Sequence, residues 1–292
     1  MQDYIVSGTA ADGTLRYFLT NTTKTVREAR EKHNLTAVAS AALGRTLTAA
    51  ALMSKTLKGE NDILTIQIKG SGPIGSIVVV SDSKANVRGY VSNPQVENRF
   101  NSQGKLDVAG VVGKPGYLNI IKDLGMKEPY IGNVSLVSGE IAEDLSCYFY
   151  YSEQIPTIVA LGVLVGKDED IINAGGYFVQ VMPGADEKII SELENRINKI
   201  PPISKLLDYE NTQDILDIIL EGLNPKVNEM SECNYICNCS RERMEAGIIS
   251  LGRDEIFDII NEQQNAELVC QFCNNKYQFT EDQLRSLVAD II

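Results

Sequence analysis

Five of the six cysteines of this chain lie after residue 232, in closely spaced positions. Four of them form two pairs separated by thirty residues: Cys237 with Cys239, and Cys270 with Cys273. Zinc in structural sites prefers four soft ligands in a tetrahedron, and two close thiolate pairs on separate segments can supply them. The spacing therefore predicts one zinc ion per chain, bound by these two pairs.

The alternative is that these cysteines are unpaired residues of a packed core. Asparagines at positions 238, 274 and 275 make both turns polar, which favours the metal site. A module of about 60 residues also buries little apolar surface on folding, whereas structural zinc supplies roughly 10–16 kcal/mol of apparent binding energy. We therefore expect metal to hold residues 231–292 together as a zinc-binding module.

The other two cysteines have no paired spacing. Cys233 precedes Cys237 by four positions and could compete as a metal ligand, act as a redox partner, or be an incidental neighbour. Cys147 alternates with aromatic residues in LSCYFYY, which predicts core packing on a strand.

Four zinc-bound thiolates can form a permanent structural site or a redox switch, and the spacing alone favours the permanent site. A switch is chemically possible because a sulfenic acid formed on one thiol condenses with a second thiol one or two residues away. A disulfide would remove two ligands, and loss of the metal would remove the main source of stability of the module. Oxidation would then unfold this end of the chain.

The rest of the chain predicts an α+β fold with a largely antiparallel sheet. Residues 4–20 predict a hairpin around Asp12-Gly13, and residues 24–57 predict two helices that break near His33. Short β-branched runs between Gly, Ser, Asn and Asp follow, without βαβ alternation. We expect further strands at residues 63–70, 75–82, 86–93, 117–122, 131–136, 144–152 and 177–182.

Composition divides the chain into a β-rich N-terminal body (1–182), a helical linker region (183–230) and the zinc-binding module (231–292). The linker carries two acidic amphipathic patterns, DEKIISELENRINKI and QDILDIILEGL. Helices of this length are unstable alone, so we expect their apolar faces to pack on the body. The module predicts helices after Ser240, at about 254–261, and from a capping box at Thr280 to Ile292.

Charge and apolar patterning limit the possible partners and compartment. The net charge is −12, and residues 231–292 hold five basic and eleven acidic side chains, which would repel nucleic acid. The N-terminus has no signal-peptide pattern. Residues 36–57 carry Arg45 in mid-stretch, which favours a buried helix over a membrane span. We expect a cytoplasmic protein, where clustered cysteines bind metal or sense redox state more often than they form permanent disulfides.

No catalytic or cofactor-binding constellation is predicted, so we expect a protein that is not an enzyme. His33 is the single histidine and lies in a charged helical pattern, which argues against Ser-His and Cys-His hydrolases. Gly70, Gly72 and Gly75 match a dinucleotide-binding spacing, but a strand rather than a helix follows, so a turn is the better interpretation. The carboxylates Glu140 and Glu143 are indistinguishable from surface charge.

The whole chain resembles the thirty-three-kilodalton heat-shock protein family of redox-regulated holdase chaperones. The similarity rests on the cysteine pattern, on CNCSRERME and CQFCNNKYQF around it, and on three body segments. Those segments are GSGPIGSIVVVSDSKANVRGYVSNP, SEQIPT and AGGYFVQVMPGADE.

This resemblance implies a function and a mechanism. The reduced protein would bind zinc through Cys237, Cys239, Cys270 and Cys273 and be inactive. Oxidation would pair Cys237 with Cys239 and Cys270 with Cys273, and the zinc would leave. The linker would then loosen, and the oxidised protein, as a homodimer, would hold unfolded client proteins on its N-terminal body without ATP. Cys233 lies outside the four-cysteine pattern, which leaves open whether Cys237 pairs only with Cys239.

Two other classes of function are open from the sequence. One is a constitutive zinc-ribbon interaction module, against which the acidic charge of the module speaks. The other is a thiol-disulfide oxidoreductase that uses Cys270 and Cys273, although the thioredoxin-like βαβ context of such motifs is missing.

Overall fold

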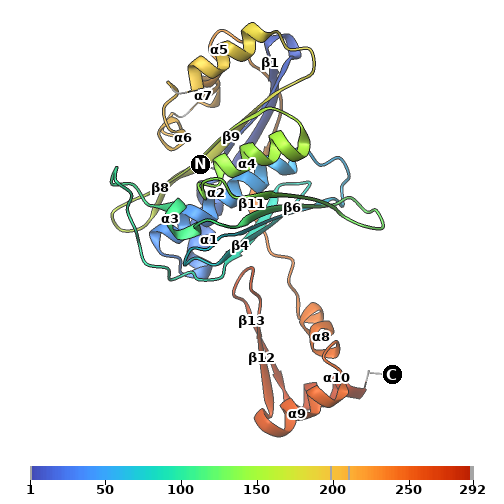
Figure 1. Cartoon of the computed structure of the whole chain (residues 1–292). Helices are drawn as coiled ribbons and strands as arrows, with labels where there is room; N and C mark the ends of the chain where they lie inside the picture. The colour runs from blue at the N-terminus through green and yellow to red at the C-terminus, as the bar shows by residue number, and fades with distance from the viewer. Residues whose placement is uncertain (1, 198, 210, 290–292) are drawn as a thin grey trace. The chain divides into compact units, whose positions relative to one another are not determined.

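The computed structural model describes residues 2–289 except 198 and 210, and it forms two compact units (Figure 1). We call Met1–Ile236 the N-terminal unit and Cys237–Ile292 the C-terminal unit. The expected linker region therefore belongs to the N-terminal unit by its contacts. Neighbouring strands pair antiparallel with one exception, which confirms the predicted α+β class.

The first sheet of the N-terminal unit has five antiparallel strands in the order β10-β1-β2-β9-β8. They are β1 (Tyr4–Ala10), β2 (Leu15–Asn21), β8 (Thr157–Val165), β9 (Ile171–Val181) and β10 (Lys226–Glu232). The first two strands form the predicted hairpin, with a 3-10 turn at Ala11–Gly13 between them. β10 comes from the end of the unit and forms the outer edge beside β1.

The second sheet has six strands in the order β11-β5-β4-β3-β6-β7. They are β3 (Ile63–Lys69), β4 (Ser76–Asp82), β5 (Asn86–Val91), β6 (Tyr117–Asp123), β7 (Tyr130–Ser135) and β11 (Asn234–Tyr235). The short β11 runs parallel to β5 and is the exception to the antiparallel pattern. Because β10 and β11 follow one another, one segment extends both sheets.

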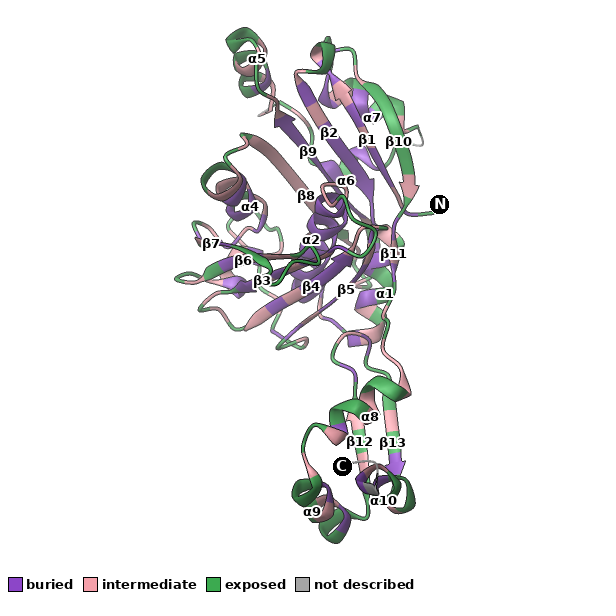
Figure 2. Ribbon diagram, turned by 90° about the vertical axis from the view of Figure 1, so that its right-hand side faces the viewer, coloured by how far each residue is buried: buried purple, intermediate pink, exposed green. Residues whose placement is uncertain are grey.

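Two helices follow the hairpin, α1 (Thr23–His33) and α2 (Ala37–Ser54), and the break between them is where the sequence predicts it. Every residue of α2 except Arg45 is buried, because the helix contacts strands of both sheets (Figure 2). A helix that is apolar on all sides needs such an enclosed position. α2 has the length and hydropathy of a membrane span, but it is 94% buried in the fold, which confirms the predicted buried helix.

The predicted strand at 144–152 is wrong. Residues Ala142–Tyr148 form α4, and a π-helical turn continues it over Phe149–Glu153. Leu145, Tyr148 and Phe149 are buried, and their i, i+3, i+4 spacing is that of a helix face. The aromatic and β-branched composition suggested a strand, but packing of this face against the core determines the structure.

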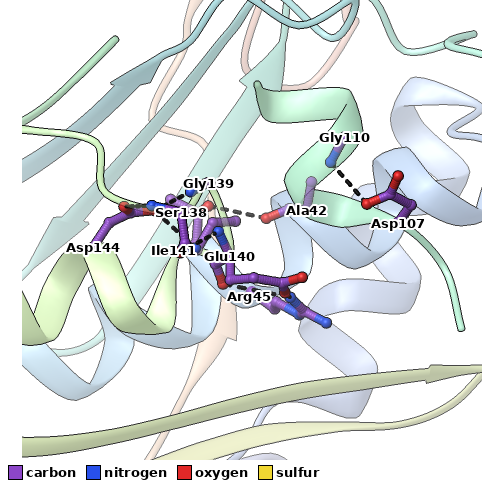
Figure 3. A network of polar contacts seen from close by, with 10 residues as sticks. Ala42, Arg45, Asp107, Gly110, Ser138, Gly139, Glu140, Ile141 and Asp144 are labelled. Atoms are coloured by element: carbon purple, nitrogen blue, oxygen red, sulfur yellow. Dashed lines mark hydrogen bonds and ion pairs between the residues drawn. The ribbon is translucent and has the colours of Figure 1, made fainter. Parts of the chain in front are cut away.

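Carboxylates bind backbone N–H groups around α4 and at the short helix α3 (Val108–Val112), as Figure 3 shows. Asp144 is fully buried and accepts hydrogen bonds from four backbone N–H groups, those of residues 137, 138, 139 and 141. Asp107 caps α3 through the N–H of Gly110. Arg45 pairs with Glu140 at 2.5 Å, so the charged residue of α2 is bound to the loop before α4 that Asp144 also contacts.

The linker helices are α5 (Glu187–Ile197), α6 (Ile203–Leu206) and α7 (Thr212–Ile219). Their buried apolar residues share a core with side chains of β1, β2 and β9, including Val6, Tyr17 and Val179. Phe18 and Phe178, which alternate with these on the strands, belong to the core that contains α2. The linker helices therefore cover the face of the first sheet opposite α2, which confirms that their apolar faces pack on the body.

The C-terminal unit contains a hairpin, β12 (Asn265–Val269) and β13 (Lys276–Thr280), with α8 (Arg241–Ile249), α9 (Arg253–Gln263) and α10 (Glu281–Ala289). Ser240 caps α8 by accepting from the N–H of Arg243, and the N–H of Thr280 donates to the side chain of Gln283. The predicted final residues of α10, 290–292, lie outside the described residues. The described apolar core of this unit is small: Ile248, Ile256, Ile260, Phe279, Leu284 and Val288.

Candidate metal centre

The four paired cysteines come from two segments of the C-terminal unit. Cys237 and Cys239 lie in the segment between β11 and α8, and Cys270 and Cys273 lie in the turn between β12 and β13. Backbone hydrogen bonds close this turn, because the N–H of Cys270 donates to the carbonyl of Asn275 and the N–H of Asn274 donates to that of Cys270. The hairpin thus fixes the backbone that carries the second pair.

The four sulfur atoms lie within 4.8 Å of one another. The Sγ atoms of Cys237 and Cys270 are 3.7 Å apart, and those of Cys239 and Cys273 are 3.3 Å apart. A tetrahedron of thiolates around zinc, with Zn–S bonds of about 2.3 Å, has sulfur–sulfur edges of about 3.8 Å. The observed group is therefore close to the size that such an ion requires, and all six cysteines are free of disulfide bonds.

The thiols of this group differ in pKa because their surroundings differ. Burial raises the pKa of Cys237 and also that of Cys273. Burial opposes ionisation of Cys239 too, but hydrogen bonds from Tyr277 (3.1 Å) and from the neighbouring thiols outweigh it and lower its pKa to about 7. The phenol shares this bond, which raises the pKa of Tyr277 to about 12.

Several thiolates at these separations repel one another, so they cannot ionise together unless a cation lies among them. A divalent metal supplies that charge and deprotonates its thiol ligands. Within the described part of the chain, this is the one group of three or more His, Cys, Asp or Glu side chains placed to hold a metal. The C-terminal unit thus carries a cysteine cluster able to bind a metal ion.

Polar contacts around the cluster support the first pair. The guanidinium of Arg243 donates to the carbonyl of Asn238, the residue between Cys237 and Cys239, at 3.0 Å. Tyr277 on β13 reaches Cys239 from the hairpin that carries the second pair. Neither residue is predictable from the sequence, since nothing in the spacing of CNCSRER or NNKYQF marks Arg243 or Tyr277 as neighbours of a thiol.

Cys233 lies in the N-terminal unit and is not part of the four-sulfur group. It is buried in the core, with its Sγ 3.9 Å from Oγ1 of Thr25. Burial, followed by the nearby carboxylate of Asp3, raises its pKa to about 12. In this fold Cys233 is a neutral, enclosed thiol.

Other residues singled out by sequence have structural positions. His33 is buried, with Nε2 3.2 Å from the hydroxyl of Tyr235, so it joins α1 to β11. Residues 70–75 form the turn between β3 and β4, which confirms the turn interpretation of the glycine pattern. Glu140 pairs with Arg45, whereas Glu143 is exposed. Cys147 is half-buried on α4 rather than on a strand.

This chain is similar to known proteins over nearly its whole length. The profile of a family described as "Hsp33 protein" matches residues 3–280. The 33 kDa chaperonin of Acetivibrio thermocellus is 56% identical over 289 residues, which cover 99% of this chain and 97% of that protein. The 33 kDa chaperonin of Clostridioides difficile is 47% identical over the full length of both chains.

Structural similarity extends over the same length. The crystal structure of the 33 kDa chaperonin from Thermotoga maritima superposes with a TM-score of 0.93 at 39% sequence identity, and the match covers 99% of each chain. The similarity therefore includes both units. This chain belongs to the Hsp33 family of chaperones.

Proposed function

We propose that this protein is a redox-regulated holdase, which binds zinc and is inactive when reduced, and which disulfide formation and zinc release activate. The observation that carries the proposal is the group of four sulfur atoms within 4.8 Å, in a unit whose described apolar core has only six buried side chains. A unit with so little buried surface depends on its metal for stability.

Zinc is the metal that this donor set favours, because four thiolates in a tetrahedral arrangement suit a soft ion without redox chemistry of its own. One ion per chain would be held by Cys237, Cys239, Cys270 and Cys273. Bound zinc would fasten the segment before α8 to the β12–β13 turn.

Oxidation would dismantle this site chemically. A thiolate attacks a peroxide oxygen to give a sulfenic acid, and a neighbouring thiol condenses with it to give a disulfide and water. Formation of each disulfide transfers two electrons from two thiols to one hydrogen peroxide, which is reduced to two water molecules. The near neighbours in sequence are Cys237 with Cys239 and Cys270 with Cys273, and after both reactions no thiolate ligand is left.

The conformational consequence concerns the linker helices. Their apolar residues cover the first sheet, including Val6, Tyr17 and Val179. Once the C-terminal unit unfolds, residues 183–230 would loosen as the functional linker region, and apolar surface on both the helices and the sheet would become accessible to clients. The oxidised form would be a homodimer that holds unfolded proteins in the cytoplasm without ATP and without enzymatic turnover.

The test is a count of thiols and zinc before and after peroxide treatment, beside an aggregation assay on the same samples. We expect four thiols and one zinc to be lost together as the holding activity rises. Full holding activity in the zinc-bound state would instead identify a constitutive interaction protein. Rapid catalytic reduction of insulin would instead identify an oxidoreductase.

A further inference from the structure

The outer strand of the first sheet, β10, is attached to the N-terminal unit almost entirely through its backbone. Six of its seven residues are exposed, among them Val227 (48%) and Met230 (62%), and none belongs to an apolar core. Its described side-chain anchor is Lys55, whose ammonium contacts Glu229 at 2.6 Å and Ser231 at 3.4 Å. A strand with so little buried surface is held weakly.

The neighbouring strand, β1, is instead held firmly by its side chains. β1 is buried on both faces, with Ile5 in the core around α2 and Val6 in the core under the linker helices. β1 therefore stays in place if β10 leaves, and only its outer edge would change environment. That edge would then present unpaired N–H and C=O groups, which form a template for another strand.

The hydrogen bonds at the two ends of β1 show which of its groups point to this edge. The N–H of Ala11 donates to the carbonyl of Leu223, and the carbonyl of Asp3 accepts from the N–H of Cys233. Backbone groups alternate in direction along a strand, so those of the odd residues Ile5, Ser7 and Thr9 also face β10. Those of Val6, Gly8 and Ala10 face β2.

β10 fits this edge imperfectly. The register shifts between Ser7 and Gly8, where Glu229 and Val227 are the successive partners, so Asn228 is an extra residue that forms a bulge. At this bulge, the hydroxyl of Tyr17 is buried and has no hydrogen-bond partner among the described residues. A side chain at Gly8 would collide with that hydroxyl and with the carbonyl of Lys226, so the edge requires glycine here.

We propose that the outer edge of β1 is a binding site for an extended segment of an unfolded polypeptide, and that β10 occupies this site as an internal substitute. The proposal rests on the proposed function, because oxidation of the C-terminal unit is what would release β10 in the parent protein. The site would recognise the backbone of the added strand, while its side chains point to solvent as those of β10 do. Such a site tolerates almost any sequence, as the clients of a holdase require.

The experiment follows amide hydrogen exchange in β1 of the full chain, residue by residue. The three states are zinc-bound reduced, oxidised, and oxidised with a reduced, carboxymethylated protein that cannot fold. Oxidation should accelerate exchange at Ile5, Ser7 and Thr9 by roughly 100-fold, and the unfolded protein should restore much of the protection. The amides of Val6, Gly8 and Ala10, which face β2, are the control within the same strand and should change little.

A pair of variants tests the site without oxidation. Glu229→Lys places a second ammonium against Lys55, so in the zinc-bound protein it should speed exchange at the odd residues of β1 and give partial binding of the unfolded protein. Glu232→Lys makes the same charge change on the same strand but has no described contact with Lys55, and it should resemble the parent. Zinc content and circular dichroism of both variants check that they fold.

Three results would overturn the assignment. One is slow exchange at Ile5, Ser7 and Thr9 in an oxidised protein that holds clients, which would leave the proposed function intact and reject this site. Another is protection that returns without client and increases with protein concentration, which would show that a second copy fills the edge. The third is equal behaviour of the two lysine variants. Failure of the oxidised protein to hold any client would refute the proposed function itself.

Discussion

At the scale of single residues, Cys239 lies in a group of thiols that can bind metal, whereas Cys233 is an enclosed thiol outside that group. Cys239 has a pKa lowered to about 7 within a group of four sulfur atoms, whereas burial raises the pKa of Cys233 to about 12 in a different unit. Metal affinity depends on deprotonated thiols, so these two residues should respond differently to zinc and to alkylation.

Serine in place of Cys270 should remove most of the bound zinc, because one thiolate ligand of four is lost and hydroxyl is a poor ligand for the ion. Cys233→Ser is the matched control and should keep one zinc per chain. Metal analysis of the purified, reduced variants measures this. Full occupancy in Cys270→Ser would remove that residue from the site.

Cys233 should resist alkylation in the folded protein. Its folded pKa of about 12 lies above the ordinary thiol value, so at pH 8 its thiolate fraction is about 1,000-fold below that of an unfolded thiol. Because the folded state favours the protonated thiol, Cys233 makes its full contribution to the free energy of unfolding below about pH 8.5. That contribution is lost as the pH rises towards 12 and the unfolded chain ionises more readily. Iodoacetamide labelling followed by peptide mass spectrometry gives the rate, and labelling in urea is the control. Equal rates in both conditions would contradict the enclosed position.

At the scale of elements, the sequence predicted those whose signal is local and missed those that tertiary contacts determine. The hairpin at β1 and β2, the break between α1 and α2, and the cap at Ser240 all follow from nearby residues. The cysteine pairs were equally readable, because ligand spacing is itself a local pattern. In contrast, the sequence of α4 predicts a strand because it is rich in aromatic residues. Packing of Tyr148 and Phe149 in the core, which the sequence does not show, makes it a helix.

The placement of β10 and β11 could not be predicted for a related reason. KVNEMSE has no alternating apolar face, so nothing in it indicates a strand, and β10 forms only because β1 offers an edge. Likewise, Tyr277 and Arg243 reach the cluster through pairing and turn geometry that no linear spacing reveals.

The stability of the loop before α4 should depend strongly on the side chain of Asp144. Asp144→Ala would leave four backbone N–H groups without their buried acceptor, at an expected loss of roughly 3–5 kcal/mol in the free energy of unfolding. Glu143→Ala changes the exposed neighbouring carboxylate and should shift stability by no more than about 0.5 kcal/mol. Urea unfolding of the zinc-bound proteins compares the two, and similar values would refute the role given to Asp144.

At the scale of the whole molecule, the two units differ in how they are stabilised. The N-terminal unit has large cores around α2 and under the linker helices, whereas the C-terminal unit has a small core and the cysteine cluster. Removal of the metal should therefore unfold the C-terminal unit and loosen the linker helices and β10, while the core around α2 stays folded.

Hydrogen exchange followed by mass spectrometry should show this difference along the chain. Oxidation with peroxide should remove protection from the C-terminal unit and from α5, α7 and β10, while β2, β3 and β9 stay protected because both of their sheets keep α2 between them. Removal of zinc with a chelator, without oxidation, should loosen the C-terminal unit in the same way. Uniform loss of protection over all strands would mean global unfolding and would reject the two-part behaviour.

The most direct test of the redox switch is light scattering from a thermally unfolding enzyme mixed with this protein in its two redox states. Zinc binding energy is large beside the stability of a small unit, so its loss can move the C-terminal unit fully to the unfolded state. The peroxide-treated protein should suppress scattering at near-equimolar ratio without ATP, and a thiol reductant with zinc should abolish that suppression. Equal suppression by the reduced, zinc-loaded protein would contradict the switch and leave the cysteine cluster as a permanent structural site.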